Sequence, residues 1–320
     1  GCVVLRVLKE ESEGGWGFGE EGVRLAEALQ VLDSDRYPSK KQAKKAIKYG
    51  SIVVDGERGT HDTLVFNSSR VAVQGRTSEA FGMAAFRRDG GELPFTIKVL
   101  YQDNCMAAVH KPPGVNSHPP STASGPESFN SMSVAVPYFV APAEGHGTEV
   151  NPWRPGPVHR LDKATEGVQL IAKTRQARRA LMLQFQERQV AKRYIAVVEG
   201  RVREREGVID IDIGDKPSHT RFRVLGTTPS SASRTDSCLT TLELFPKQGR
   251  THQLRIHCKE HFGMPIVGDN RYGGLDLGCG LLLAAVDIKV AHPDTRVELT
   301  FSIGEPERFL RLKQQEQLAW

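Results

Sequence analysis

Few features of this sequence suggest disulfide bonds, a metal ribbon or a membrane anchor. It has five cysteines, no two of which form a CxxC pair, so neither a disulfide framework nor a zinc ribbon is expected. No uncharged apolar run approaches the roughly 18 residues of a membrane-spanning helix. The nearest candidate, residues 131–143, is interrupted by two prolines. This cysteine usage predicts a reducing, intracellular compartment, either the cytoplasm or an organelle.

Length and composition are those of an ordinary globular protein. At roughly 150 residues per domain, a chain of 320 residues predicts about two domains. Hydrophobic residues make up 39% and charged residues 25%, which excludes disorder of the whole chain. The net charge of +5 permits an acidic partner such as RNA without requiring one. Because the first residue is glycine, the natural start is expected upstream, and residues 2–8 are too short and charged for a signal peptide.

The chain is predicted to contain a small N-terminal unit followed by a larger one. Residues 1–21 lack periodicity and predict a flexible lead-in. Residues 22–76 predict two helices followed by strands, with a capping-box pattern that begins the second helix after Ser39. Residues 77–93 predict a linker, and residues 94–320 predict the larger domain.

The second predicted helix carries a basic face. Its members are Lys40, Lys41, Lys44, Lys45 and Lys48. A lysine face is usually only solvated, but its functional interpretation is contact with phosphate groups. The unit resembles the alpha-L RNA-binding motif of a ribosomal protein and several RNA-modifying enzymes, through residues 23–25, 39–48 and 47–56. The resemblance implies that the five lysines bind RNA.

The larger domain is predicted to have many strands and few helices. Residues 117–157 are rich in Pro, Ser and Gly and predict a long surface insertion, and a helix is expected over residues 175–189. This pattern favours an α+β fold with a mixed, mainly antiparallel sheet. The expected strands are residues 97–100, 106–109, 168–172, 194–198, 208–213, 221–225, 239–245, 281–290 and 297–303.

Three segments concentrate charged side chains between apolar runs. They are residues 159–167 (HRLDKATEG), 192–194 (KRY) and 249–257 (GRTHQLRIH). In the third, Thr251 is expected to cap a helix that ends at Gly263, which would place a histidine and an arginine on one helix face.

The residues alone leave several interpretations of these segments open. Asp162 could form a surface ion pair, worth about 0–1 kcal/mol, or act as a catalytic carboxylate at the mouth of a cleft. The histidines His252, His257 and His261 could hold a metal, although the sequence has no HExxH motif.

Taken in order, the segments resemble the motifs of the RluA-type RNA pseudouridine synthases. Residues 159–162, with Thr165 and Gly167, match the family's catalytic-aspartate motif, and Lys192-x-Tyr194 matches its second motif. The third motif matches residues 249–257 followed by Gly263, Pro265, Gly268-Asp269 and Tyr272-Gly273. Residues 109–119 resemble the opening Lys-Pro-x-Gly segment, so the resemblance covers residues from about 94 to 303.

This resemblance implies conversion of uridine to pseudouridine in RNA without a metal or an organic cofactor. Asp162 is then the catalytic carboxylate, as nucleophile or as base. Arg255 is its implied ionic partner, which would keep it ionised despite burial. Tyr194 is implied to stack on the target base and to assist proton transfer.

The remaining implied site residues contact the substrate. Arg160 would fill the gap left by the flipped nucleotide, since the reacting atoms are out of reach within a stacked helix. Leu283 would pack near the base. His159, Arg250 and His252 are implied substrate-binding residues through their motif positions.

Three residues depart from the family pattern. Glu166 replaces the usual Ser, Ala284 replaces a common His, and His110 replaces Asn or Asp. The charge of Glu166 is expected to weaken RNA binding or alter target choice. Alternatives are therefore an RNA-binding protein without catalysis and, on the three histidines, a metal-dependent hydrolase.

The expected substrate is ribosomal RNA, with transfer RNA as the alternative. No membrane and no protein partner are implied, and a monomer is expected.

Overall fold

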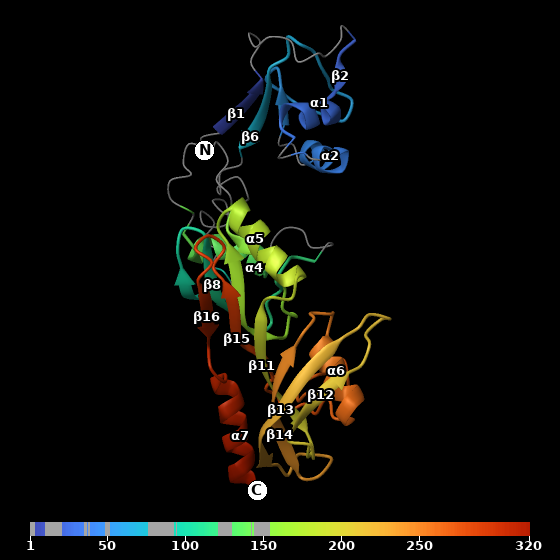
Figure 1. Ribbon diagram of the computed structural model, residues 1–320, viewed down its shortest axis with the longest axis vertical. Helices are drawn as coiled ribbons and strands as arrows, with labels where there is room; N and C mark the ends of the chain where they lie inside the picture. Colours follow the sequence, from blue (N-terminus) through green and yellow to red (C-terminus); the bar gives the residue numbers. More distant parts are fainter. Residues whose placement is uncertain are drawn as a thin grey trace. The chain divides into compact units, whose positions relative to one another are not determined.

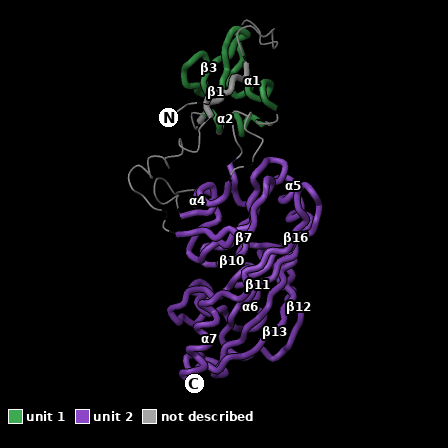
Figure 2. Tube along the Cα trace, turned by 90° about the vertical axis from the view of Figure 1, so that its left-hand side faces the viewer, with its two compact units in different colours: residues 1–92, 145–152 green, residues 93–144, 153–320 purple. Residues whose placement is uncertain are grey.

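The computed structural model divides into two compact units, which Figures 1 and 2 show. One comprises residues 1–92 and 145–152, and the other residues 93–144 and 153–320. The structure describes residues 4–9, 21–34, 37, 39–48, 52–75, 93, 95–120, 130–141, 143 and 154–320. No helix among these residues is long and apolar enough to cross a membrane.

The first unit packs two helices against short strands. Its described elements are β1 (Val4–Lys9), β2 (Val23–Arg24), α1 (Leu25–Leu32), α2 (Lys40–Lys48), β3 (Ile52–Val54), β4 (Glu57–Arg58), β5 (Leu64–Val65) and β6 (Val71–Gly75). The strands pair in the order β1-β6-β3-β4, and β2 pairs with β5. Leu25, Leu29, Ile47 and Ile52 join α1, α2 and β3 in one buried core.

Local sequence patterns predicted the helix α2 but not the strand β1. As expected, α2 follows Ser39, whose carbonyl and hydroxyl oxygens both accept a hydrogen bond from the Gln42 amide. By contrast, β1 lies inside the segment predicted as a flexible lead-in and pairs antiparallel with β6. Its partner strand is remote in the sequence, so nothing local indicated the hydrogen bonds that hold it.

The second unit is built on one large sheet. Its described elements are β7 (Lys98–Gln102), β8 (Met106–Lys111), α4 (Met132–Phe139), β9 (Gly156–Pro157), β10 (Glu166–Ala172), α5 (Arg175–Gln186), β11 (Ala191–Glu199), β12 (Glu206–Asp210), β13 (His219–Pro229), β14 (Cys238–Pro246), α6 (Gln253–Phe262), β15 (Leu283–Ala291), β16 (Glu298–Ser302) and α7 (Glu307–Ala319). The strand order is β12-β13-β14-β11-β15-β10-β8-β7, with β16 beside β15 and β9 beside β10.

This sheet confirms the predicted α+β fold with a mixed, mainly antiparallel sheet. Only β10 and β15 pair in parallel among the described strands, with Glu166 opposite Ala284. The centre of the sheet is shielded from solvent, since β10, β14 and most of β11 and β15 are buried. Figure 1 shows α5, α6 and α7 beside different parts of this sheet.

Two helices of this unit were not predicted. The segment 117–157, expected to be a surface insertion, contains α4, whose Met132, Ala135 and Val136 are buried with Val109 of β8. This helix has only eight residues and an internal proline, which hides its periodicity. The other is α7, which buries Phe309 and Leu312 and leaves Leu310 and Leu318 exposed among polar residues.

Candidate active site

A half-open cavity of about 90 Å³ in the second unit brings the three charged motifs together. Every site residue predicted for this unit lines it, except His159. The lining residues are Arg160, Leu161, Asp162, Thr165, Lys192, Tyr194, Pro246, Gln248, Gly249, Arg250, Thr251, His252, Gln253, Leu254, Arg255 and Leu283.

The buried Lys111 fixes the loop that carries Asp162. Lys111 ends β8, is fully buried, and donates hydrogen bonds to the carbonyl oxygens of Pro112, Lys163 and Thr165 at 3.0, 3.2 and 2.7 Å. Within the loop, the Thr165 amide donates to the Asp162 carbonyl oxygen at 3.1 Å. These bonds hold the turn, so the partly exposed Asp162 carboxylate keeps a fixed place in the cavity.

Tyr194 reaches the cavity from β11. The register between β11 and β15 shifts between Arg193 and Tyr194, and such an irregularity re-aims a side chain relative to the sheet. Burial raises the pKa of the Tyr194 phenol above its ordinary value, and the charge of Asp162 raises it further. The phenol therefore stays protonated and acts in the site as a neutral ring with one hydroxyl.

Arg255 is held by a different carboxylate from the one predicted. Its Nε and Nη2 donate to Asp269 at 2.7 and 2.6 Å, whereas its Nη1 lies 3.7 Å from Asp162 Oδ2. Burial opposes the charge of Arg255, but Asp269 and Asp162 together raise its pKa. A two-pronged pair of this kind fixes the guanidinium plane, so Asp269 aims Arg255 at Asp162.

His252 also faces Asp162, at the start of α6. Its Nε2 is 3.9 Å from Asp162 Oδ2, and its Nδ1 is 3.0 Å from the Tyr272 hydroxyl. The predicted cap at Thr251 was wrong, because His252 itself is the residue before the helix and adopts a left-handed backbone with φ of 56°. That conformation is uncommon outside glycine and asparagine, and here it presents the ring to the cavity.

Further cationic groups surround the carboxylate. Arg160 is exposed at the cavity, whereas Arg250 is half-buried. Lys192 donates to the Gln248 carbonyl oxygen at 2.9 Å, and burial lowers the pKa of its amine to about 8. Leu283 supplies an apolar wall. Such an excess of positive charge attracts phosphate groups.

His159, predicted to bind substrate, is the one predicted site residue of this unit that the cavity lining does not include. Its ring stacks on Phe185 of α5 with centroids 4.7 Å apart, and its Nε2 accepts a hydrogen bond from the Leu170 amide at 2.9 Å. Arg160 therefore lines the cavity, while the neighbouring His159 anchors the loop to the core.

The half-buried His159, whose Nε2 accepts a hydrogen bond, predicts an acid-sensitive fold. Burial lowers the pKa of His159 to about 3. Between about pH 6.5 and 3, this imidazole is therefore protonated in the unfolded chain but neutral in the folded chain. The free energy of unfolding should therefore fall as the pH drops from about 6.5 towards 3, by up to about 1.4 kcal/mol per pH unit from this group. Urea denaturation of wild type and His159→Gln between pH 7.5 and 4.5 measures this, and the variant should show the shallower pH dependence. Parallel curves would contradict it.

The three departures from the family pattern lie next to one another. Glu166 pairs in register with Ala284, and its Oε2 is 3.5 Å from His110 Nε2. Its other oxygen accepts from Arg308 of α7. Burial opposes ionisation of Glu166, but His110 and Arg308 outweigh it and lower the pKa of this carboxyl. The charge expected to repel RNA is thus buried, paired and outside the cavity lining.

The alternative metal site on three histidines has no geometric support among the described residues. His252 packs against Tyr272 instead. His257 Nε2 donates to the Ile211 carbonyl oxygen at 3.1 Å, and His261 packs its ring near Phe222. The three rings therefore serve different contacts.

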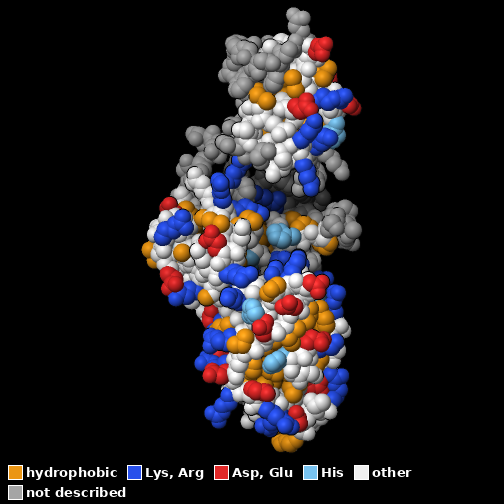
Figure 3. Space-filling model, turned by 45° about the vertical axis from the view of Figure 1, so that its right-hand side comes forward, with side chains coloured by type: hydrophobic (Ala, Val, Ile, Leu, Met, Phe, Trp, Pro, Cys, Tyr) orange, Lys and Arg blue, Asp and Glu red, His pale blue; other side chains and the backbone are white. Residues whose placement is uncertain are grey.

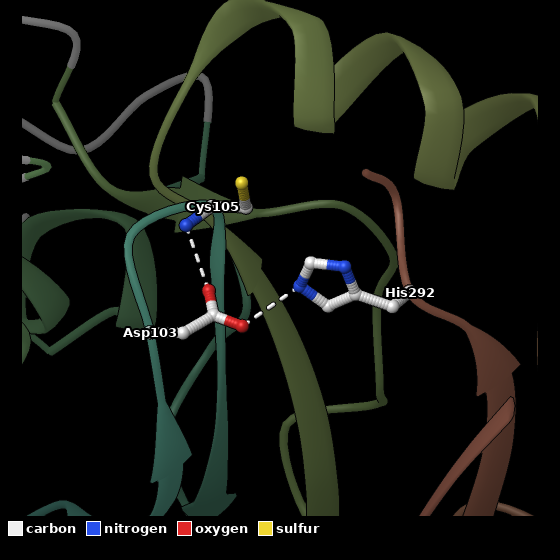
Figure 4. Close-up of side chains that lie close together, drawn as sticks. All are labelled: Asp103, Cys105 and His292. Carbon is white, nitrogen blue, oxygen red and sulfur yellow. Dashed lines mark hydrogen bonds and ion pairs between the residues drawn. The ribbon is translucent and has the colours of Figure 1, made fainter. Parts of the chain in front are cut away.

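A different cluster of His, Cys and Asp residues forms a hydrogen-bond network around one carboxylate. Figure 4 shows Asp103, Cys105 and His292, whose ligand atoms lie within 4.8 Å of one another. The Asp103 carboxylate accepts from the Tyr101 hydroxyl, from His292 Nε2 and from the amides of Cys105 and Met106. Both carboxylate oxygens thus accept hydrogen bonds, and this network connects the β7–β8 turn to the end of β15.

Comparison with known proteins identifies the family. The family described as RNA pseudouridylate synthase matches residues 106–260. The dual-specificity RNA pseudouridine synthase RluA of Yersinia pestis is 36% identical over 214 residues, which cover 63% of this chain and 96% of that protein. The chain belongs to the RluA-type RNA pseudouridine synthases. Ribosomal large subunit pseudouridine synthase C of Buchnera aphidicola is 32% identical over 225 residues, covering 62% and 63% of the two chains.

A solved structure shares the fold. The structure of human RNA pseudouridylate synthase domain containing 4 covers 75% of this chain and 97% of its own, with a TM-score of 0.52 and 21% sequence identity. In this pseudouridine synthase, the sheet of the second unit is therefore the family's fold, and the cavity lies on it.

Two residues important to the synthase's cavity received no role from sequence reasoning. Asp269 stood inside the third motif, so its position was visible although its bond to Arg255 was not. Lys111 likewise stood in the Lys-Pro-x-Gly segment, and its burial was the missing information.

The predicted RNA-binding lysines belong to the other unit. Lys40, Lys41 and Lys44 are exposed on α2, and Lys40 forms an ion pair with Glu27 of α1. The side chains of Lys45 and Lys48 lie outside the described residues.

Proposed function

We propose that this synthase isomerises uridines of ribosomal RNA, with Asp162 as the catalytic carboxylate. The observation that carries the assignment of the site is the cavity in which Asp162 faces Arg255, His252 and Tyr194. Ribosomal RNA is favoured because the matched Buchnera protein is by name a ribosomal large subunit enzyme.

The reaction rearranges one nucleotide without net change in composition. The bond between C1′ of the ribose and N1 of the uracil breaks, the freed base turns, and C5 bonds to C1′. The proton on C5 is lost and N1 gains one. A carboxylate suits the first step because it can attack as a nucleophile or remove a proton as a base.

Arg255 and Tyr194 prepare this carboxylate and the base. Arg255 faces Asp162 at 3.7 Å, close enough to favour its charged form while leaving its oxygens free of a direct hydrogen bond from the guanidinium. Tyr194, neutral and only half-buried, offers a flat face on which a uracil ring can stack. Leu283 completes the apolar side.

Access to the cavity requires a flipped nucleotide. A base inside a duplex is shielded by its stacked neighbours, so an enzyme acting on it turns it out of the helix. The exposed Arg160 beside the cavity can occupy the vacated space. Figure 3 shows Lys and Arg side chains gathered beside His side chains on the visible face of this unit, where they can hold the flanking phosphates.

Release of tritium from uracil tests this proposal. Transcripts of ribosomal RNA labelled with tritium at C5 should lose the label to water with wild type and retain it with Asp162→Ala. Transfer RNA transcripts serve as the competing substrate class. Release from transfer RNA alone would reject the ribosomal assignment, and equal release with Asp162→Ala would reject the assigned carboxylate.

The lysines of α2 should contribute binding energy but no chemistry. Replacing Lys41 and Lys44 by Gln removes two exposed charges, so the slope of log affinity against log salt should fall by up to about two units. Filter binding of a ribosomal RNA fragment from 50 to 300 mM salt, roughly the range in which such effects are large, measures this. Single-turnover rates on a short bound RNA should not change. An unaltered salt slope would mean that α2 does not contact RNA.

A further inference from the structure

Arg308 of α7 makes three hydrogen bonds to two separate segments of the chain. Its Nε donates to Glu166 at the start of β10, its Nη1 donates to the Cys279 carbonyl oxygen at 3.0 Å, and its Nη2 donates to the Leu281 carbonyl oxygen at 2.8 Å. The Arg308 side chain is 24% exposed and that of Glu166 is 7% exposed. One largely buried guanidinium thus bridges two parts of the chain that are far apart in sequence.

Both bridged segments lead directly into the catalytic cavity. Glu166 follows Thr165, which lines the cavity and whose carbonyl oxygen accepts the shortest of the three Lys111 bonds. Leu281 lies two residues before the apolar wall residue Leu283. The guanidinium therefore spans the gap between the loop that carries Asp162 and the strand that forms the opposite wall.

The bridge also reaches the arginine that faces Asp162. The Leu282 amide donates to the Val267 carbonyl oxygen at 2.9 Å. Two residues later in that turn, Asp269 holds Arg255. A shift of the segment 279–282 would therefore move both Leu283 and the support of Arg255.

The residues around Arg308 fit this role. His110 and Glu166 depart from the family pattern together with Ala284, and all three lie at the same junction of β8, β10 and β15. Glu166 supplies the carboxylate that Arg308 needs, and the small Ala284 opposite it is fully buried. Arginine suits the position because a planar fork can serve several acceptors at once, which a lysine cannot.

We propose that Arg308 is a positioning residue that sets the distance between the Asp162 loop and the Leu283 wall, so that the C-terminal helix α7 forms part of the catalytic apparatus. The inference rests on the proposed role of Asp162. It assigns to α7 a function in catalysis, beyond burying its own Phe309 and Leu312 in the core.

The test compares two variants of the same helix. Arg308→Gln breaks the bridge. Lys313→Gln breaks another ion pair of α7, to Glu305 at 2.6 Å, which touches no residue of the cavity. Arg308→Gln should lower kcat by roughly tenfold to a hundredfold, because small misplacements of reacting groups cost that much, with KM for RNA within about threefold. Lys313→Gln should lower the melting temperature but leave kcat unchanged.

Two further measurements separate positioning from simple loss of stability. Arg308→Lys keeps the charge and one partner and should not restore kcat. Amide hydrogen exchange at residues 162–167 and 279–283 should quicken in Arg308→Gln and not in Lys313→Gln. If Arg308→Gln proves too unstable, Glu166→Gln weakens only the bond between Arg308 and Glu166. It should lower kcat by less than Arg308→Gln, again with KM for RNA within about threefold.

Equal kcat losses in the two helix variants, or unchanged exchange at both cavity segments, would overturn the proposal. Wild type and Asp162→Ala in the same tritium-release assay report on the proposed function separately. The exchange measurement needs no activity, so the two failures are distinguishable.

Discussion

Asp162→Asn should abolish isomerisation while leaving the protein folded and bound to RNA. Asparagine matches aspartate in size, so the turn held by Lys111 and Thr165 is preserved. The amide can neither attack C1′ nor remove a proton, so the rate should fall on the order of a thousandfold or more, as when a nucleophile or base is deleted from other enzymes. Tritium release under single-turnover conditions measures this loss.

Binding measurements provide the control for Asp162→Asn. Removing one negative charge from a cavity surrounded by Arg160, Lys192 and Arg250 should leave RNA affinity unchanged or raise it slightly. A melting temperature close to that of wild type would exclude misfolding. Retention of more than about a tenth of the wild-type rate would contradict the role of Asp162, since a catalytic base alone contributes about 10²–10⁴-fold.

Asp269→Asn should be the second most damaging change. It removes the anchor of Arg255 and leaves a buried guanidinium whose nearest remaining carboxylate is Asp162 at 3.7 Å. We expect Arg255 to turn and pair directly with Asp162, which would block the oxygens needed for chemistry. The rate should fall roughly a hundredfold, and breaking a buried pair should lower the free energy of unfolding by about 3–5 kcal/mol.

A second paired aspartate serves as the matched control for this variant. Asp287 forms an ion pair with Arg193 on the same sheet but does not line the cavity. Asp287→Asn should reduce stability without a comparable loss of kcat. Urea denaturation and single-turnover rates of both variants provide the comparison. A normal rate in folded Asp269→Asn would show that the aim of Arg255 is unimportant.

The groups that we propose to react could be named from the sequence because they lie in contiguous motifs. Asp162, Tyr194 and Arg255 could be assigned from three short segments, and the structure brings all three to one cavity. Short apolar runs were enough to predict most strands of the large sheet. Such apolar patterns are local in the sequence, so a strand can be recognised without knowing which strand it pairs with.

Supporting contacts could not be predicted because they join distant segments. Glu166 and Arg308 are 142 residues apart, and neither segment carries a pattern that names the other. The orientation of His159 depended on which side of a loop faces the core, and no period exists in a loop to indicate it. The short α4, with its internal proline, had too few turns to be recognised.

The parallel pairing of β10 with β15 has a consequence for synthesis of the enzyme on the ribosome. Antiparallel neighbours such as β7 and β8 can pair as soon as both emerge, whereas β10 meets β15 about 120 positions later in the chain, a slow and long-range closure. Because Leu283 begins β15 and Arg308 follows it, a nascent chain exposes Asp162 well before it has a cavity. The carboxylate that we propose as catalytic therefore acquires its complete cavity only after β15 has been translated.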